Sequence, residues 1–469
     1  MKVLVTGASG YIGRNLINTL KKDCEIIAVS RNTSNKKNEK NVVWKQADLY
    51  SQIDIERVME EIDVAVYLVH SMHPSSKLTQ GTFRDMDAIL ADNFARAAKI
   101  KGVRRMVYLS GIIPDDKKLS NHLKSRLECE NILGSYGIPV VTLRAGLIVG
   151  QNGSSFPILK SLVERLPAMI LPSWAYHKTH PIALKDVINI LKSTITREVS
   201  CNQIIDIGGP EEKNYRELFE ETAQVMEKKL PMIDLPVIPI TVSKFWVRLI
   251  SQAPKEMVYP LLESLVHDMT MNKNHYVHGI SNAPTTFKES VRTALDNEKA
   301  KNTLKKKRFN IKKEINRNDV KSVQRIKIPS QWEISDVADY YIYWLSRMSG
   351  RVVNTDVKED ITHITLPFFK TPILTLEKSN ARSYRDRRLY YIKGGSFAFM
   401  RKEGRSRLEF RRVLDTDEVL IALHEYEPAL PWFVYSITQA RIHLIVMRLF
   451  GIETKILSKI LNHSTIESH

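Results

Sequence analysis

Three glycines near the start of the chain constrain its fold more than any other feature. Gly7, Gly10 and Gly13 follow a short apolar run at residues 3–5 and precede a segment with helical apolar spacing. Gly7 permits a tight turn, Gly10 lets backbone approach a pyrophosphate, and Gly13 lets a helix pack closely on the strand. The helix N-terminus adds unpaired N–H groups and the positive end of its dipole. This order of strand, loop and helix predicts a dinucleotide-phosphate site.

Strand-like and helix-like segments alternate up to about residue 200, which predicts an α/β fold with a doubly wound parallel Rossmann sheet. The predicted strands are residues 25–29, 42–44, 64–69, 105–109, 139–143 and 203–207. The predicted helices are residues 87–101, 119–136 and 215–228.

The bulk properties favour a globular protein of several domains. A chain of 469 residues is too long for one core, and 43% of it is hydrophobic. Three scattered cysteines form no disulfide or metal-binding pattern, so we expect a reducing, cytoplasmic compartment and no metal. Met1 leads directly into the first strand, so we expect no signal peptide. Charged residues interrupt the apolar stretch 430–452, which argues against a membrane span.

The net charge of +18 arises from two stretches. Residues 288–327 hold fourteen basic and five acidic residues, and residues 378–412 hold twelve and three. The N-terminal domain is therefore close to neutral, and we expect no nucleic-acid partner. The first stretch indicates a solvated basic linker at residues 291–330, although it could contact an anionic membrane surface. The second could steer a ligand or a membrane, but arginines on strand surfaces are usually solvated.

Two further regions complete the predicted organisation, with residues 1–290 as the nucleotide-binding domain. Apolar clusters at residues 232–268 form either a substrate lid or simple packing on the sheet. Residues 331–469 read as a separate α+β domain with a helix at 335–348 and a final helix from 431 to about 459. Six short runs between these helices predict an antiparallel sheet, namely 361–366, 373–376, 389–393, 396–400, 407–414 and 419–426. A sheet curled around the final helix would bury Phe433, Ile437, Ile442, Val446 and Phe450.

The chain resembles the extended and atypical branches of the short-chain dehydrogenase/reductase superfamily over about residues 1–290. Thr6-Gly7-x-x-Gly10-x-x-Gly13 is similar to the superfamily's cofactor motif, and His180-Pro-Ile-x-x-x-Asp186-Val187 is similar to a later strand–helix junction. The segment 143–150 resembles an Arg-Pro-Gly segment, with Ala145 replacing proline. The runs at 67–72 and 143–146 resemble those of bacterial members with a C-terminal domain of the DUF2867 type. The C-terminal part of the chain resembles a helix-grip fold, which in other families encloses an apolar ligand.

The resemblance implies a nicotinamide cofactor. It assigns cofactor contacts to Gly7, Ala8, Ser9, Gly10, Tyr11, Ile12, Gly13, Asp48, Leu49, Val69 and His70. The Asp48 carboxylate would meet the adenine amine, His70 would lie near the nicotinamide end, and Asn93 would shape the sheet. Residues 28–32 end the second strand without a carboxylate, and Ser30 and Arg31 would accept a 2′-phosphate. NADP(H) is therefore expected in preference to NAD(H).

The family's catalytic residues are a Ser and a Tyr-x-x-x-Lys pair. Ser110 matches the serine, while His122 stands in the tyrosine place and Arg126 in the lysine place. Four-residue spacing puts both on one helical face. Histidine can exchange a proton near neutral pH, but the neighbouring arginine would favour neutral imidazole and weaken it as an acid. Alternatively, His122 is an exposed helix residue and Arg126 pairs with Glu130.

These features favour an NADP(H)-binding reductase acting on an apolar carbonyl or quinone-like compound. The alternative is a dinucleotide sensor or assembly scaffold without turnover, whose C-terminal domain binds a lipid or a partner. A nucleotide-sugar epimerase is less favoured because its chemistry uses the missing tyrosine. Homodimers formed through helices are common in the superfamily, so the resemblance allows a homodimer as well.

Overall fold

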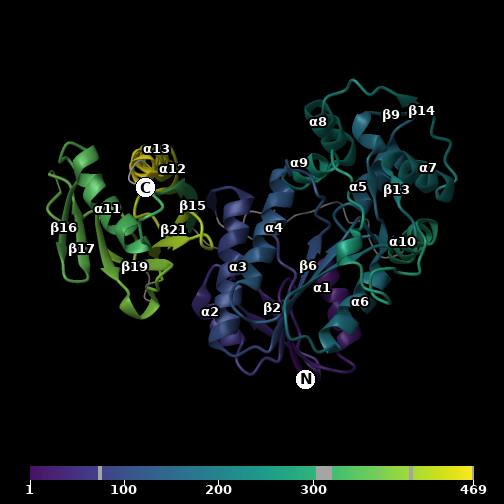
Figure 1. Cartoon of the computed structure of the whole chain (residues 1–469), viewed down its shortest axis with the longest axis horizontal. Helices are drawn as coiled ribbons and strands as arrows, with labels where there is room; N and C mark the ends of the chain where they lie inside the picture. Colours follow the sequence, from purple (N-terminus) through teal and green to yellow (C-terminus); the bar gives the residue numbers. More distant parts are fainter. Residues whose placement is uncertain (72–76, 303–318, 368, 401–404, 467–469) are drawn as a thin grey trace. The chain divides into compact units, whose positions relative to one another are not determined.

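Two large sheets organise the described part of the chain (Figure 1). The computed structural model describes residues 1–71, 77–302, 319–367, 369–400 and 405–466. An N-terminal unit comprises Met1–Met72 and Asp87–Ile311, and a C-terminal unit comprises His73–Met86 and Lys312–His469. The short stretch 73–86 therefore belongs to the second unit, although it lies within the first third of the sequence.

Short, buried apolar runs form the seven parallel strands of the N-terminal sheet. In sheet order they are β12 (Gln203–Ile207), β7 (Val140–Ala145), β6 (Arg105–Gly111), β4 (Val64–Tyr67), β1 (Lys2–Val5), β2 (Glu25–Ser30) and β3 (Val42–Gln46). The strand order reverses at β1, which pairs with β2 on one side and β4 on the other. Such a switch point is where open α/β sheets bind ligands.

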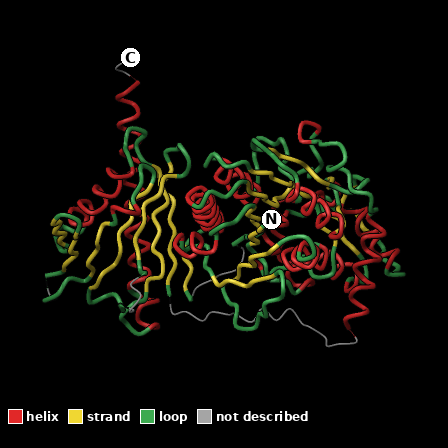
Figure 2. The backbone as a smooth tube through the Cα atoms, turned by 90° about the horizontal axis from the view of Figure 1, so that it is seen from below, coloured by secondary structure: helices red, strands yellow, loops and turns green. Residues whose placement is uncertain are grey.

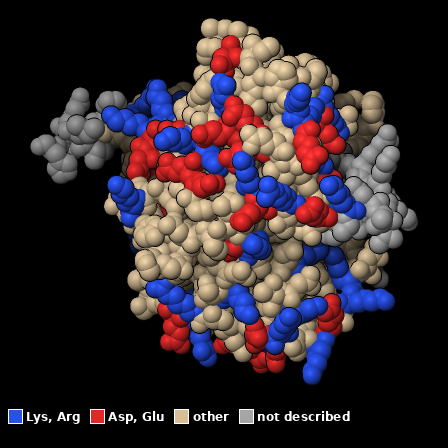
Figure 3. Space-filling view, turned by 90° about the vertical axis from the view of Figure 1, so that its right-hand side faces the viewer, with Lys and Arg blue, Asp and Glu red and all other residues tan. Residues whose placement is uncertain are grey.

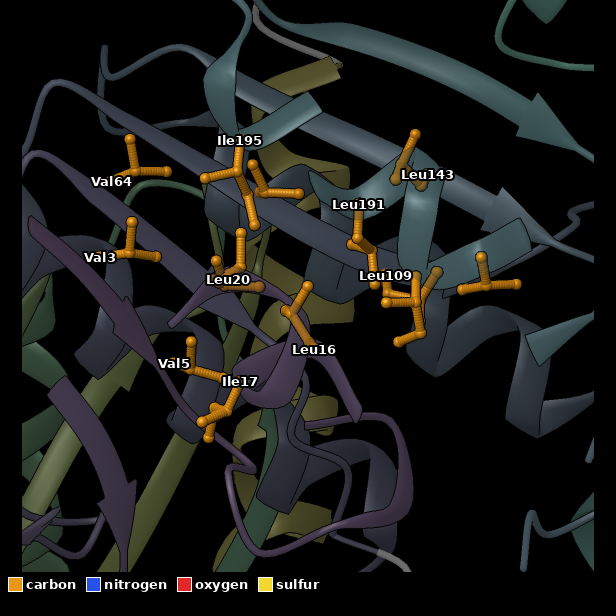
Figure 4. Packing of buried hydrophobic residues seen from close by; sticks show 14 of the residues in the cluster. Val3, Val5, Leu16, Ile17, Leu20, Val64, Leu109, Leu143, Leu191 and Ile195 are labelled. Carbon is orange, nitrogen blue, oxygen red and sulfur yellow. The ribbon is translucent and has the colours of Figure 1, made fainter. Parts of the chain in front are cut away.

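Helices cover both faces of this sheet, as the doubly wound prediction requires (Figure 1). One face carries α1 (Tyr11–Leu20) and α6 (Leu184–Thr196), and the other carries α2 (Gln52–Val58), α3 (Phe83–Ile100) and α4 (Asn121–Gly134). Figure 4 shows apolar side chains of α1 and α6 packed against those of the strands, all of them buried. The predicted fold class is therefore confirmed.

The remaining elements of the N-terminal unit build a second small core that includes Phe156, Trp174 and Phe219. Three strand pairs contribute, namely β8 (Ile148–Val149) with β11 (Ile182–Ala183), β9 (Met169–Leu171) with β14 (Met232–Asp234), and β10 (Lys178–Thr179) with β13 (Lys213–Asn214). The helical elements are α5 (Phe156–Arg165), η1 (Ser173–Tyr176), α7 (Tyr215–Val225), α8 (Ile240–Ser251), α9 (Lys255–Ser264), η2 (Lys273–His275) and α10 (Phe287–Asn302).

The C-terminal unit is built on an eight-stranded sheet, antiparallel except at one edge. Figure 2 shows strands of this sheet side by side in yellow. Its order is β16 (Asn354–Lys358), β17 (Ile361–Thr365), β18 (Leu374–Lys378), β19 (Arg387–Gly394), β20 (Arg407–Arg412), β21 (Glu418–Tyr426), β15 (Val320–Lys327) and β5 (Leu78–Gln80). The other elements are α11 (Ile334–Met348), η3 (Asn380–Arg382), α12 (Trp432–Ile437) and α13 (Gln439–Ile466). The predicted antiparallel sheet is thus present, with β5 as an edge strand that runs parallel to β15.

Several local predictions in the C-terminal half were wrong. Residues 396–400 form no strand; Ala398 makes only an isolated bridge to Pro428, after a turn at Gly395 with φ +124°. The final helix is broken at Thr438, whose φ of −114° and ψ of −89° are not helical. The expected linker 291–330 contains the end of α10 and all of β15, and residues 303–318 lie outside the described part of the chain.

The final helix also buries a different face from the one expected. Phe433, Ile437 and Ile442 are 74%, 45% and 58% exposed, whereas Phe450 is fully buried and Val446 is half-buried. Phe450 packs with residues of α11 and the sheet in one apolar core. The sheet therefore meets α13 along the face that carries Phe450, and the Ile442 face points away from this core.

The charged residues are distributed differently from the sequence-based picture of solvated arginines. Arg387, Arg407 and Arg411 of the C-terminal sheet are buried, and the Arg387 Nε lies 2.9 Å from Glu409 Oε1. Arg411 also pairs with Glu409, and Arg407 pairs with Glu425 at 3.0 Å. On the face of the molecule drawn in Figure 3, Lys and Arg side chains lie among Asp and Glu side chains.

Candidate functional site

The glycine loop is shaped by close backbone approaches that leave no room for side chains. Gly7 has a φ of +67°, and a Cβ there would lie 2.7 Å from the Leu68 carbonyl oxygen. A Cβ on Gly13 would lie 2.4 Å from the Gly7 carbonyl oxygen. Both positions therefore require glycine, as the sequence predicted. Gly10 is the N-cap of α1 and provides no side-chain cap, so the first-turn N–H groups can meet an anion.

The end of β2 lies beside this loop, and β3 follows β2 in the sheet. The Ser9 hydroxyl donates to the Ser30 hydroxyl at 2.9 Å, which joins the loop to the end of β2, where Arg31 is exposed. Asp48 is half-buried and accepts a hydrogen bond from the Tyr50 N–H at 3.1 Å, next to buried Leu49. Asn93 donates to the carbonyl oxygens of Leu49 and Tyr50. Asn93 thus holds the loop after β3, which agrees with its expected structural role.

The other expected cofactor residues line the same switch point. Ala8 is fully buried beneath the loop, while Tyr11 and Ile12 are half-buried in the first turn of α1. Val69 and His70 are half-buried just after β4. A cradle that a Cβ would fill, beside an uncapped helix N-terminus, fits a dinucleotide pyrophosphate. Within the described ranges, no cluster of three or more His, Cys, Asp or Glu residues could hold a metal ion.

Ser110, His122 and Arg126 come from two neighbouring elements of the sheet. Ser110 is buried near the carboxyl end of β6, and its hydroxyl lies close to the Tyr108 phenol. Arg126 on α4 donates from Nη1 to the Tyr108 hydroxyl at 3.3 Å. Burial raises the pKa of Tyr108 to about 12, although Arg126 opposes that shift. Tyr108 therefore stays protonated and serves as the partner of Arg126.

Glu130 does not pair with Arg126, contrary to the alternative drawn from their spacing. It forms two hydrogen bonds with Arg144 instead, to Nε at 3.0 Å and to Nη2 at 2.8 Å. Both side chains are buried, and paired hydrogen bonds of this kind are strong. The segment 143–146 therefore ties β7 to α4, and Arg126 bonds Tyr108 instead of Glu130.

His122 is buried, so it is not an exposed helix residue. Its Nδ1 lies 3.1 Å from the Ser264 hydroxyl at the end of α9, and its Nε2 has no hydrogen-bond partner among the described residues. Burial holds the pKa of His122 well below its usual range, and Arg126 and His70 lower it further. The imidazole is therefore neutral at physiological pH, as expected from the neighbouring arginine.

A second histidine, His70, lies near this ring. The centroids of the His70 and His122 rings are 5.5 Å apart, and His70 Nδ1 pairs with the Asp87 carboxylate. Asp87 also accepts hydrogen bonds from the Ser71 N–H at 2.7 Å and the Ser125 hydroxyl at 3.2 Å. Burial would raise the pKa of Asp87, but His70 and Arg126 outweigh burial and lower it. Asp87 is therefore an anion that orients His70.

The sequence-based interpretation missed Asp87, Ser264 and Tyr108 as members of this site. Asp87 lies near the start of α3 and Ser264 at the end of α9. Neither position stands in a recognisable motif with His122, so only the folded chain brings them together. A carboxylate near the start of a predicted helix was the one available signal for Asp87.

An apolar pocket opens beside His122. It encloses about 900 Å³ of empty space, open solvent at its mouth included. Gly111, which follows Ser110, and His122 form one side, and most other lining side chains are aliphatic or aromatic. No Lys, Arg, Asp or Glu is among these lining residues. The polar members are His122, Ser155, Thr179, Tyr215 and Ser264.

The expected lid region contributes to this pocket. Val247 of α8 and Val258, Leu261 and Leu262 of α9 line it. The apolar clusters at residues 232–268 thus do more than cover the sheet. They form a wall of the space next to His122.

Parts of this chain are similar in sequence to known proteins. Residues 3–170 match the model of the NAD dependent epimerase/dehydratase family. The Auxiliary protein GraX of Staphylococcus aureus is 35% identical over 142 residues, which are 30% of this chain and 43% of GraX. The chain thus spans less than half the length of that relative. The UDP-glucose 4-epimerase of Vibrio cholerae is 23% identical over 296 residues, which are 58% of this chain and 88% of that protein.

Solved structures show the same fold. A nucleoside-diphosphate-sugar epimerase from Staphylococcus aureus aligns with a TM-score of 0.51 at 14% identity, over 62% of this chain and 100% of its own. The triphenylmethane reductase of Citrobacter sp., solved in complex with NADP(H), aligns with a TM-score of 0.50 at 16% identity, over 62% and 99%. Residues 3–170 are thus similar to the NAD dependent epimerase/dehydratase family, and the solved structures show a shared fold.

Proposed function

We propose that the N-terminal unit binds NADP(H) and reduces an apolar carbonyl or quinone-like compound. The apolar pocket beside His122 is the observation that carries this proposal. Ligand pockets are typically 300 to 1,000 Å³, mostly apolar, with a few polar groups that fix orientation. A substrate without charge fits a wall that offers hydroxyl groups and one imidazole.

The residues divide into a cofactor cradle and a proton-handling group. Gly7 to Gly13 and the N-terminus of α1 would hold the pyrophosphate, Ser30 and Arg31 the 2′-phosphate, and Asp48 the adenine amine. Bound NADPH would supply a hydride to the substrate. The chain must then place a proton on the substrate oxygen. His122 and Tyr215 are the titratable side chains that line the pocket. Burial raises the pKa of Tyr215 well above its usual value, so His122 is the group better suited to exchange a proton near neutral pH.

The surroundings of His122 allow it to move a proton in either direction. The Ser264 hydroxyl lies 3.2 Å from the Pro260 carbonyl oxygen and 3.1 Å from His122 Nδ1. When Ser264 donates to His122, Nε2 carries the hydrogen and can donate it to an oxygen anion, and the ring anion left behind then takes a proton from water. When Ser264 donates to Pro260, Nδ1–H donates to Ser264 and Nε2 can accept a proton. The neutral ring can therefore serve reduction or the reverse oxidation.

The relatives bear on the reaction type in two ways. A reductase that binds NADP(H) shares the fold, which supports the assignment of NADP(H) here. Nucleotide-sugar epimerases share it too, but a diphosphate and sugar hydroxyls would meet few polar partners in this pocket. The apolar lining and the histidine in the tyrosine place favour reduction.

A non-catalytic sensor or scaffold is the second candidate, and one observation favours it. Burial and Arg126 lower the pKa of His122, so the protonated ring is scarce near neutral pH and only the weakly acidic N–H of the neutral ring remains to donate. In that case the N-terminal unit would report cofactor occupancy. The C-terminal unit, which we compare with the DUF2867 type, would then bind a lipid or partner.

The test of turnover is NADPH oxidation by the full chain against a panel of hydrophobic aldehydes, ketones and quinones. We expect oxidation with at least one of them, and we expect His122→Ala to reduce kcat by about 100-fold or more, the usual scale of general acid catalysis. His278→Ala, at an exposed position, serves as the control. NADPH binding without oxidation across the panel would favour the sensor instead, and unchanged kcat in His122→Ala would remove His122 from the mechanism.

The cofactor preference is tested by fluorescence titration with NADPH and NADH. We expect tighter binding of NADPH, and we expect Arg31→Asp to weaken it by roughly 10- to 100-fold because a charge-assisted hydrogen bond becomes a repulsion. Lys22→Asp, also exposed on the same unit, should leave the ratio of affinities unchanged. Tighter binding of NADH by the unmodified chain would contradict the assignment.

A further inference from the structure

The two C-terminal helices carry an apolar face that no described residue covers. On α13, Met447, Phe450 and Thr454 are buried toward the sheet. On the opposite side, large apolar side chains recur at intervals of three and four residues and are 41% to 58% exposed, namely Ile442, Ile445, Leu449, Ile452 and Ile456. This spacing makes a continuous stripe along the helix. We call it the α13 stripe.

The exposed face continues onto the preceding helix. Phe433 of α12 is 74% exposed, and Val434 and Ile437 are 39% and 45% exposed. Only Thr438 separates the two helices in the sequence. Soluble monomers rarely expose contiguous apolar surface of this extent without a function.

A row of cations borders the α13 stripe. Arg441, Arg448, Lys455 and Lys459 are exposed, and the first three recur every seven residues, so they follow one edge of the stripe. None of the four forms an ion pair with a described residue. Glu453, the acidic residue between Gln439 and Lys459, is already engaged by Arg347 and by the Tyr340 hydroxyl at 2.9 Å. The cations therefore remain available to an external anion.

We propose that the α13 stripe and the exposed side chains of α12 dock this protein onto an anionic lipid bilayer. An amphipathic helix with large aliphatic and aromatic side chains on one face and lysine or arginine beside them lies in the membrane interface. Each cation near an anionic surface adds about 1 kcal/mol of attraction. Phe433 and the stripe would enter the acyl boundary, and the four cations would meet the lipid phosphates.

The cations beside the α13 stripe also argue against a second copy of the chain as its binding partner. Pairing two stripes in antiparallel orientation would place the Arg441, Arg448 and Lys455 rows against each other. In parallel orientation these cations would face Val446, Glu453 and Ile460, of which only Glu453 is acidic and it is already paired. In the part of the chain that the structure describes, no helix is long and apolar enough to cross a membrane. The stripe is therefore proposed to lie on the bilayer.

The experiment measures co-sedimentation of the full chain with vesicles of phosphatidylcholine alone or mixed with phosphatidylglycerol. We expect binding to the anionic vesicles that weakens as salt rises, and little binding to the neutral ones. Arg441→Gln/Arg448→Gln/Lys455→Gln should lower the partition coefficient by on the order of 100-fold. Ile445→Gln/Leu449→Gln should lower it at least about tenfold by removing apolar contact.

Matched controls separate this surface from general charge and from misfolding. Lys22→Gln/Lys99→Gln/Lys229→Gln removes three exposed cations from the N-terminal unit and should bind vesicles as the unmodified chain does. NADPH titration and circular dichroism verify that each variant is folded. The proposal is overturned if the unmodified chain ignores anionic vesicles, or if the α13 variants bind them normally. It is also overturned if Ile445→Gln/Leu449→Gln merely converts a dimer into a monomer.

Discussion

At the scale of single residues, the site depends on two positions, 122 and 126, where the chain has histidine and arginine and the resembled family has tyrosine and lysine. Arg126 bonds the Tyr108 hydroxyl and lowers the pKa of His122, while burial lowers it more. A family tyrosine would need a nearby cation to become a proton donor, whereas a histidine beside the same cation becomes neutral. Nε2 of that neutral ring remains without a partner among the described residues and lines an apolar pocket. His122 and Arg126 therefore determine which proton transfers this site can perform.

Gly13→Ala tests the cradle at this scale. The new Cβ would lie 2.4 Å from the Gly7 carbonyl oxygen and 2.9 Å from the Ala8 Cα, so backbone must shift. We expect NADPH affinity to fall at least about tenfold and the free energy of unfolding to fall by about 1 to 3 kcal/mol, the usual cost of overpacking. Gly394→Ala is the control, since no atom lies within 4 Å of its Cβ. Titration and denaturant unfolding provide the two readouts, and normal NADPH binding by Gly13→Ala would show that the loop can relax.

At the scale of elements, α4 and α13 each use different faces for different contacts. On α4, His122 lines the pocket and Arg126 bonds the Tyr108 hydroxyl of β6, while Glu130 anchors the helix to Arg144 of β7. On α13, one face packs on the sheet, where His443 Nε2 lies 3.0 Å from the Ser322 hydroxyl of β15. Burial lowers the pKa of His443 to about 4. Both helices are therefore held by specific polar contacts as well as by apolar packing.

His443 should make the stability of the C-terminal unit dependent on pH. Its folded pKa of about 4 lies below the unfolded value near 6.5, so the unfolded chain binds the proton more readily. Stability is complete above pH 6.5 and is lost as the pH falls toward 4. We expect a loss of about 2 kcal/mol between pH 7 and pH 5. Denaturant unfolding of His443→Gln should show a smaller loss, while exposed His278→Gln should behave as the unmodified chain; an equal loss in all three would exclude His443 as the cause.

At the scale of the whole molecule, the candidate functional site and the buried charge network lie in different units of the chain. The N-terminal unit holds the cofactor cradle and the apolar pocket, and the C-terminal unit holds a charged network within its sheet. Burial would raise the pKa of Glu409, but Arg387, Arg411 and their neighbours lower it far below its usual range. Glu409 is thus a buried anion that compensates several buried arginines. Part of the excess positive charge of residues 378–412 therefore lies in buried ion pairs that hold the sheet together.

Glu409→Gln should affect one unit and spare the other. Removing this carboxylate leaves the buried guanidinium groups uncompensated, which typically costs about 3 to 5 kcal/mol. Calorimetry should therefore show a lower unfolding temperature, while NADPH affinity at low temperature stays the same. Glu377→Gln breaks an exposed pair with Lys393 and should have little effect on either measurement. A lost NADPH affinity in Glu409→Gln would mean that the two units are not independent.

The sequence determined those features that depend on local chemistry. Gly7 and Gly13 are required by the backbone conformation and by close packing of the loop on the first helix. The spacing of apolar residues in strands and helices follows from the burial of one face of each element. The alternation of these periods was sufficient to predict the doubly wound sheet. The same local reasoning failed where a segment has no strong period, as at 396–400, or where the buried face of a helix depends on its partner, as at Ile442.

The tertiary structure alone decided what joins distant parts of the chain. It brought Asp87 and Ser264 to His122, paired Glu130 with Arg144, and placed β5 in the sheet of the C-terminal unit. It also buried Arg387 and Arg411 around Glu409. None of these contacts has a local signature, because each depends on which surfaces meet once the apolar faces are buried. The nucleotide cradle follows from the sequence, and the chemistry beside it follows from the fold.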